Sequence, residues 1–135
     1  MHRTLPGWEV LSDREIRIQE SDQAELIASA RLGELPGGRP ALHRPDLALV
    51  SPEGNVVVAV EVELSIKAPR RLAAICRAWA RARHISAVYY LTPSPVARAV
   101  ERAIAETRSE DRIVVLPIDQ PKALDVINEL EASHA

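Results

Sequence analysis

The chain has 135 residues, of which 47% are hydrophobic, and its net charge is −2. This length and composition predict a single globular domain over residues 1–135 and exclude a disordered chain. No apolar run reaches the roughly 18 residues of a membrane span, and nothing resembles a signal peptide. The single cysteine excludes an internal disulfide. We therefore expect a cytoplasmic protein without membrane contact.

The first forty residues predict one helix and, after it, a loop. Ser12-Asp13-Arg14-Glu15 is a capping-box pattern, in which a serine begins a helix and a glutamate closes its first turn. The helix should run from Ser12 to about Glu20. Residues 24–30 fit an extension of it, a second short helix or a strand. Residues 35–40 (Leu-Pro-Gly-Gly-Arg-Pro) are a loop by composition.

Two apolar segments separated by a turn predict an antiparallel hairpin in the middle of the chain. Leu47–Val50 is a short strand, residues 51–55 (Ser-Pro-Glu-Gly-Asn) have turn chemistry, and residues 56–64 form a long strand. The second strand is almost wholly apolar, as expected of a central strand that is covered on both faces.

After the hairpin, helical and strand patterns alternate, which predicts strands paired in parallel and an α/β mixed sheet flanked by helices on both faces. The first of these helices carries one apolar stripe, made of Leu72, Ile75, Cys76 and Trp79. The predicted elements are a helix over 69–83, a strand over 85–91, a helix from 92 to about 108, a strand over 113–116 and a helix from Pro121 onward.

Glu61 and Glu63 stand one residue apart within the second hairpin strand. Strand side chains alternate between faces, so both carboxylates point the same way, repel each other and lose hydration. If Val50 pairs with Val57, Asp46 lies opposite Glu61, whereas a shift of one residue turns it to the other face. Three converging carboxylates suit Mg²⁺ or Mn²⁺, and such an ion can activate water and stabilise charge at a phosphorus centre.

The same acids also allow a purely structural interpretation. Arginine can neutralise buried carboxylates, so Arg70, Arg71 or Arg77 would then form an ion-pair network with the two glutamates. Asp46 would be a turn acid at the start of its strand, and His43 a loop histidine. We favour the metal interpretation for the three acids, whereas for His43 we favour a solvent-exposed or hydrogen-bonded loop histidine over a ligand.

The segment from residue 64 to residue 100 contains seven basic and no acidic residues. Such a distribution predicts a basic surface that attracts a polyanion such as DNA. Arg70 and Arg71, at the start of the predicted helix, are the candidate contacts to backbone phosphates. A solvated helix face explains the same two residues equally well.

The acidic pattern resembles the PD-(D/E)XK nuclease superfamily: Pro45-Asp46 is followed, fifteen residues on, by Glu61-Val62-Glu63, and the predicted element order matches the superfamily core. More narrowly, His43-Arg44-Pro45-Asp46 and Val60–Glu63, with the basic helix behind them, resemble the nuclease-like domain of plasmid replication-relaxation proteins over roughly residues 8–117. The resemblance implies a restriction-endonuclease-like fold and a metal-dependent DNA endonuclease that serves plasmid or mobile-element replication.

By this resemblance Asp46 and Glu61 are metal ligands, whereas Glu63 stands where the superfamily usually has a lysine. Glu63 would then add a ligand or orient the attacking water. Lys67, four residues on, is the candidate replacement for the lysine. Glu15 matches the glutamate that several members supply from their first helix.

The resemblance also sets expectations about partners. A single small catalytic domain cuts one strand, so cleavage of both DNA strands would need a homodimer. Replication-relaxation proteins usually carry a winged-helix part upstream, which the resemblance does not cover, so sequence-specific reading would need a separate DNA-binding chain or domain. The acid at the lysine position motivates an alternative, a catalytically inactive nuclease-like module that binds DNA. A protein-interaction domain is a third option, against which the basic segment argues.

Overall fold

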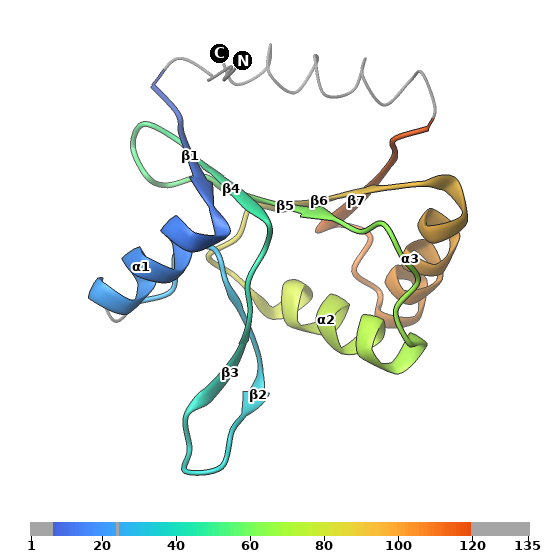
Figure 1. Cartoon of the computed structure of the whole chain (residues 1–135), viewed down its shortest axis with the longest axis horizontal. Coiled ribbons are helices and arrows are strands. Elements are labelled where there is room, and N and C mark those ends of the chain that lie inside the picture. Colours follow the sequence, from blue (N-terminus) through green and yellow to red (C-terminus); the bar gives the residue numbers. More distant parts are fainter. Residues whose placement is uncertain (1–6, 24, 120–135) are drawn as a thin grey trace.

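A computed structural model of the chain describes residues 7–23 and 25–119. Within these residues the fold is α/β, with a mixed five-stranded sheet, a separate two-stranded sheet and three helices (Figure 1). In chain order the elements are β1 (Glu9–Ser12), α1 (Asp13–Gln23), β2 (Ala30–Glu34), β3 (Pro40–His43), β4 (Leu47–Val50), β5 (Val57–Val62), α2 (Pro69–Arg81), β6 (Ala87–Thr92), α3 (Ser94–Thr107) and β7 (Ile113–Pro117).

The five-stranded sheet has the strand order β1-β4-β5-β6-β7. The pairs β1–β4 and β4–β5 are antiparallel, and the pairs β5–β6 and β6–β7 are parallel. Parallel neighbours need a crossover, and α2 and α3 supply the two crossovers. Because both crossovers step in the same direction along the sheet, a common hand places both helices on one face. The predicted mixed sheet with its central hairpin is therefore confirmed.

All three described helices lie on the same side of the sheet, below it in Figure 1. The predicted helical cover of both faces is not found among residues 7–23 and 25–119. The helix predicted from Pro121 onward lies outside the described residues.

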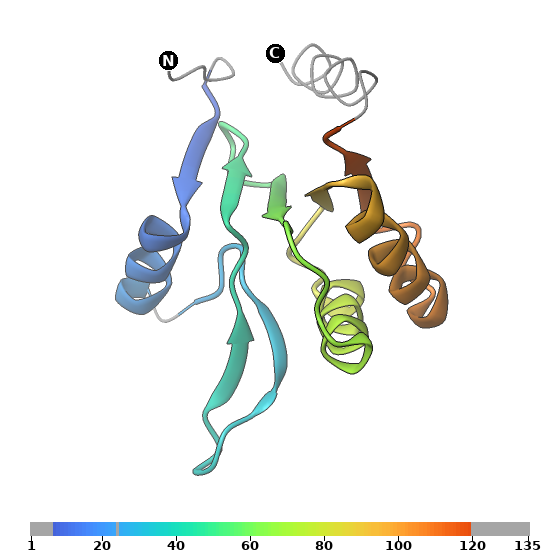
Figure 2. The same cartoon turned by 45° about the vertical axis from the view of Figure 1, so that its right-hand side comes forward.

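Two parts of the sheet structure were not predicted. The edge strand β1 has only two apolar residues in four, too few for an alternating pattern to stand out. Within the undecided segment 24–30, residues 25–29 lead into β2, which begins at Ala30 and pairs with β3 through an irregular register between Arg31 and Gly33. This second hairpin extends away from the main sheet (Figure 2). The predicted loop at residues 35–40 connects its strands, and Pro40 begins β3.

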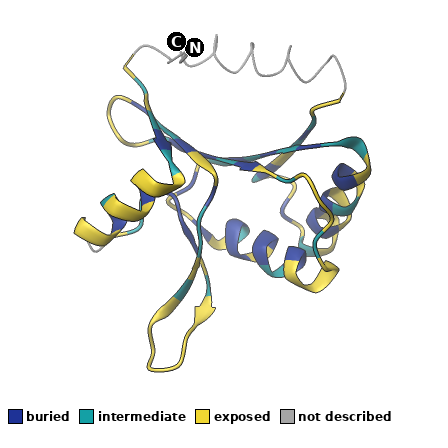
Figure 3. Cartoon of the chain, viewed as in Figure 1, coloured by how far each residue is buried: buried dark blue, intermediate teal, exposed yellow. Residues whose placement is uncertain are grey.

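The hydrophobic core lies between the sheet and α2. The predicted apolar stripe of this helix is confirmed, and Figure 3 shows its buried face against the sheet. A leucine or isoleucine side chain such as Leu72 or Ile75 contributes roughly 1.5–3 kcal/mol when it is fully removed from water. The basic residues of α2 lie on its exposed side. The stripe residues, each at most 2% exposed, are Leu72, Ile75, Cys76 and Trp79.

Candidate functional site

The turn between β4 and β5 sets the register of the predicted acidic hairpin. Ser51 N–H donates to the carbonyl of Val56 at 2.9 Å, and Val56 N–H donates to Ser51 Oγ at 3.0 Å. Gly54 has φ +75°, a conformation that glycine adopts without strain. The turn brings Val50 opposite Val57, which confirms the register predicted from the sequence.

Asp46 lies just before β4, and both its backbone and its side chain bind the neighbouring strand. The regular β4–β5 ladder ends one residue short of Asp46. The Asp46 N–H donates to the carbonyl of Val60 at 3.1 Å, and the Val62 N–H donates to Asp46 Oδ2 at 2.7 Å. The Asp46 carboxylate is therefore held at the residue that separates Glu61 from Glu63.

Glu61 is a buried carboxylate on β5, only 7% exposed. Its Oε2 lies 2.5 Å from His43 Nε2 and accepts a hydrogen bond of 3.2 Å from the Tyr90 hydroxyl. A carboxylate can only accept, so His43 donates from Nε2. The His43 ring packs edge-on against Trp79, with ring centroids 5.7 Å apart. These contacts offset the cost of burying the Glu61 charge.

Glu63 continues from β5 toward the sixth strand. Its N–H donates to the carbonyl of Leu91 at 3.0 Å, which extends the parallel pairing by one residue. Its Oε2 accepts a hydrogen bond of 2.6 Å from Lys67 Nζ, and the two groups form an ion pair. The role of Lys67 as a replacement for the superfamily lysine stays a prediction.

Each of the three acids forms its side-chain hydrogen bonds to the described residues through only one of its two carboxylate oxygens. Asp46 bonds through Oδ2, and Glu61 and Glu63 each bond through Oε2. Their other carboxylate oxygens have no hydrogen bond within the described part of the chain. In those same residues, no group of three or more His, Cys, Asp or Glu side chains is arranged to hold a metal ion. The three-carboxylate metal site therefore stays a prediction.

The alternative arginine network is not formed among residues 7–23 and 25–119, where the two glutamates pair with His43 and Lys67 instead. Arg70 and Arg71 are exposed at the start of α2. Their proposed phosphate contacts stay a prediction.

The Glu15 carboxylate closes the predicted capping box of α1. Ser12 N–H donates to Glu15 Oε1 at 3.0 Å, and Glu15 N–H donates to Ser12 Oγ at 3.2 Å. The capping box is therefore confirmed. A role for Glu15 as a metal ligand stays a prediction.

Sequence reasoning missed the two side chains that hold Glu61. His43 was expected in a loop but ends β3, and Tyr90 lies on β6, whose Cα pairing places it opposite Glu61. The parallel register between β5 and β6 is set by the intervening helix rather than by a short turn, so no local signal marks this pair. The one sequence signal for either residue is that His43 stands three residues before Asp46, in the motif His43-Arg44-Pro45-Asp46.

The charge of Glu61 also acts on its buried neighbours. Burial, with a further contribution from Glu61, raises the pKa of the Cys76 thiol to about 12. The same two causes raise the pKa of the Tyr90 hydroxyl well above its ordinary value. Cys76 is fully buried, so it is a packing residue rather than a nucleophile, as expected from its place in the apolar stripe.

The raised pKa of Cys76 predicts a loss of stability at alkaline pH. The unfolded thiol loses its proton at about pH 8.5, whereas the folded thiol keeps its proton until about pH 12. Between these values the folded state binds the extra proton, so stability falls with rising pH by up to about 1.4 kcal/mol per pH unit. Urea denaturation at pH 7, 9 and 10 should show a smaller decline for Cys76→Ala than for wild type. An equal decline in the free energy of unfolding for Cys76→Ala and wild type would contradict this prediction.

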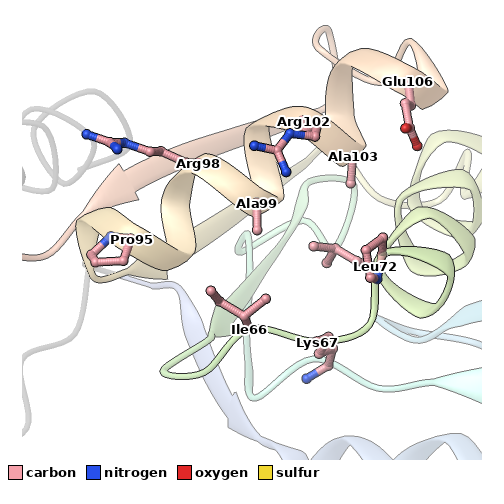
Figure 4. A pocket seen from close by; sticks show the side chains of 10 residues that line it. Ile66, Lys67, Leu72, Pro95, Arg98, Ala99, Arg102, Ala103 and Glu106 are labelled. Atoms are coloured by element: carbon pink, nitrogen blue, oxygen red, sulfur yellow. The ribbon is translucent and has the colours of Figure 1, made fainter.

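A pocket of about 270 Å³ opens beside Lys67, between the segment that leads into α2 and helix α3 (Figure 4). Ile66 and Leu72 contribute to its apolar lining, and Arg98 and Arg102 line it from α3. Since Lys67 also binds Glu63, this pocket adjoins the acidic group and offers further cations to an anionic ligand.

Comparisons with protein-family models, with curated proteins and with solved structures each find no match to the chain. None of the helices in the described part of the chain has the length and apolar character required to span a membrane.

Proposed function

We propose that the chain is a metal-dependent DNA phosphodiesterase with a restriction-endonuclease-like fold. One observation carries the proposal: the Asp46 carboxylate is bound to the Val62 N–H, between Glu61 and Glu63. The order of α1, the acidic hairpin, α2 and the parallel strand β6 supports the same fold. The basic residues of the segment that follows the acids suit a polyanionic substrate.

Asp46 and Glu61 would hold Mg²⁺ or Mn²⁺. Magnesium typically takes one or two carboxylates from the protein and completes its shell with water and phosphate oxygens. Asp46 and Glu61 each have one carboxylate oxygen without a hydrogen bond to the described residues, and so fit this donor set. When bound, the ion would polarise a phosphoryl oxygen and lower the pKa of a coordinated water.

Neighbouring side chains would orient the metal-binding carboxylates and place positive charge beside the substrate. His43 and Tyr90 bind one oxygen of Glu61 and so fix the orientation of its carboxylate. Lys67 places an ammonium group beside Glu63, where it would offset charge on the scissile phosphate. Arg98 and Arg102, across the adjoining pocket, would bind phosphates of the same strand.

The proposal predicts that Asp46→Asn lowers plasmid nicking by at least about 100-fold, because a metal ligand loses its charge. Asparagine keeps an oxygen acceptor for the Val62 N–H, so the hairpin should remain folded. Supercoiled plasmid would be incubated with Mg²⁺, Mn²⁺ or EDTA, with the exposed Asp22→Asn as the matched control. Open circles indicate a monomer that cuts one strand, and linear plasmid indicates a homodimer. Undiminished nicking by Asp46→Asn would refute the metal assignment.

A second candidate function is a catalytically inactive nuclease-like module that binds DNA. Lys67 is engaged by Glu63, the acid that stands at the position of the superfamily lysine, and this pair favours loss of catalysis. Binding of DNA by wild type without nicking in either metal would support this candidate over the phosphodiesterase.

A further inference from the structure

A second pocket, of about 640 Å³, lies away from the acidic group, between α1, the β2–β3 hairpin and the end of α2. Figure 2 shows α1 and the hairpin on the same side of the sheet. Three arginines from different parts of the chain line this pocket: Arg17 from α1, Arg31 from β2 and Arg44 from the segment after β3. His84 lines it beyond the end of α2.

The three guanidinium groups have no acidic partner within residues 7–23 and 25–119, where the ion pairs are those of Glu61 and Glu63. The Nε of Arg44 is buried and has no hydrogen-bond partner among the described residues. Leaving a charged donor buried and unbonded costs free energy, and the remaining guanidinium N–H groups of Arg17, Arg31 and Arg44 are the donors that an anion in the pocket could engage. The pocket is therefore prepared for an anionic group.

The two acids of the pocket do not fill this role. The Glu20 carboxylate is occupied by three backbone N–H groups at 2.8–3.0 Å and by the Ser29 hydroxyl at 2.6 Å. Glu25 is exposed and forms no ion pair within the described part of the chain. His84 Nε2 donates to the carbonyl of Ser29 at 2.8 Å, which fixes its ring at the pocket wall.

The cationic lining continues beyond this pocket. Two adjoining hollows, of about 240 and 250 Å³, share Arg31 and add Arg81 from the last turn of α2. A single phosphate would need one such pocket, whereas a strand of nucleic acid presents a series of phosphates. Arg44, Arg31 and Arg81 follow one another along these hollows, as contacts to successive phosphates of one strand would require.

We propose that this arginine-lined pocket binds the phosphodiester backbone of a nucleic acid. Guanidinium groups donate to phosphate oxygens in a bidentate manner, and backbone contacts of this kind are independent of base sequence. The site is separate from the basic start of α2 and does not depend on cleavage by the acidic group. It gives the chain a second place at which a long strand is held.

The experiment measures the binding of fluorescein-labelled single-stranded and double-stranded oligonucleotides in EDTA, where cleavage cannot contribute. Arg31→Ala and Arg44→Gln should each raise the Kd roughly 10-fold, as expected for a lost charge-assisted contact. The slope of log Kobs against log salt should fall by about 0.7–0.9 for each phosphate contact removed. Arg14→Ala, one turn before Arg17 on α1 but outside the pocket, should leave both values close to wild type.

Arg31 is exposed, so its variant tests the site even if Arg44→Gln unfolds, which thermal denaturation would reveal. A parallel titration uses inorganic phosphate. If phosphate stabilises wild type but not Arg44→Gln, while oligonucleotides bind both equally, the pocket takes a free anion and the strand assignment is overturned. It is equally overturned if wild type binds no oligonucleotide, or if Arg31→Ala binds as wild type does.

Discussion

Glu61→Gln should lower metal-dependent plasmid nicking by at least about 100-fold while the chain stays folded. Glutamine has nearly the same shape, and its amide oxygen can still accept the hydrogen bond from Tyr90. The substitution removes the negative charge that a divalent ion requires. Loss of activity without loss of structure would therefore trace the effect to the charge of Glu61 rather than to its packing.

The controls for this prediction separate charge from folding. Glu53→Gln changes an exposed acid in the β4–β5 turn and should nick plasmid as wild type does. Isothermal titration with Mn²⁺ should show weakened binding for Glu61→Gln but not for Glu53→Gln. Equal nicking rates in wild type and Glu61→Gln would remove Glu61 from the proposed catalytic group, even if Asp46→Asn is inactive.

Glu20→Ala should lower the free energy of unfolding by about 3 kcal/mol at pH 7. The Glu20 carboxylate accepts hydrogen bonds from the N–H groups of Ile27, Ala28 and Ser29 and from the Ser29 hydroxyl. Ala28 and Ser29 are fully buried, so alanine would leave their donors without partner or water. Urea denaturation measures the loss, and Glu101→Ala on the exposed side of α3 is the matched control.

The stabilisation by Glu20 should also depend on pH. Burial acts to raise the pKa of Glu20, but the hydrogen bonds from Ser29, Ala28 and Ile27 outweigh it, and the net pKa is lowered. A lowered folded-state pKa gives stability that is present above the unfolded pKa, about 4.3, and is lost as the pH falls through the folded value. Wild type should therefore lose its advantage over Glu20→Ala on acidification. A constant difference from pH 7 to pH 3 would contradict this account.

Several parts of the fold followed from local chemistry. The capping box begins α1, and the turn at residues 51–56 gives the Val50–Val57 register. The apolar stripe of α2 is buried as its spacing required. In each case the determining contacts join residues close in the chain or follow a helical period, so a single sequence contains the signal.

The surroundings of the acids could not be predicted in the same way. Glu61 meets His43 from the second hairpin and Tyr90 from the next strand, eighteen and twenty-nine residues away. The arginine-lined pocket likewise joins residues of α1, β2 and the segment after β3. Such contacts depend on how separate elements pack, and their sequence separations follow no period.

The sequence alone determined the acidic hairpin, because strand alternation and turn geometry constrain neighbouring residues directly. It also determined which side of α2 is buried, because the apolar stripe of this helix gains free energy when it leaves water. Only the tertiary structure decided which groups hold each carboxylate. The reason is that hydrogen bonding of a buried charge is settled by the elements that pack around it, after the local conformation is already set.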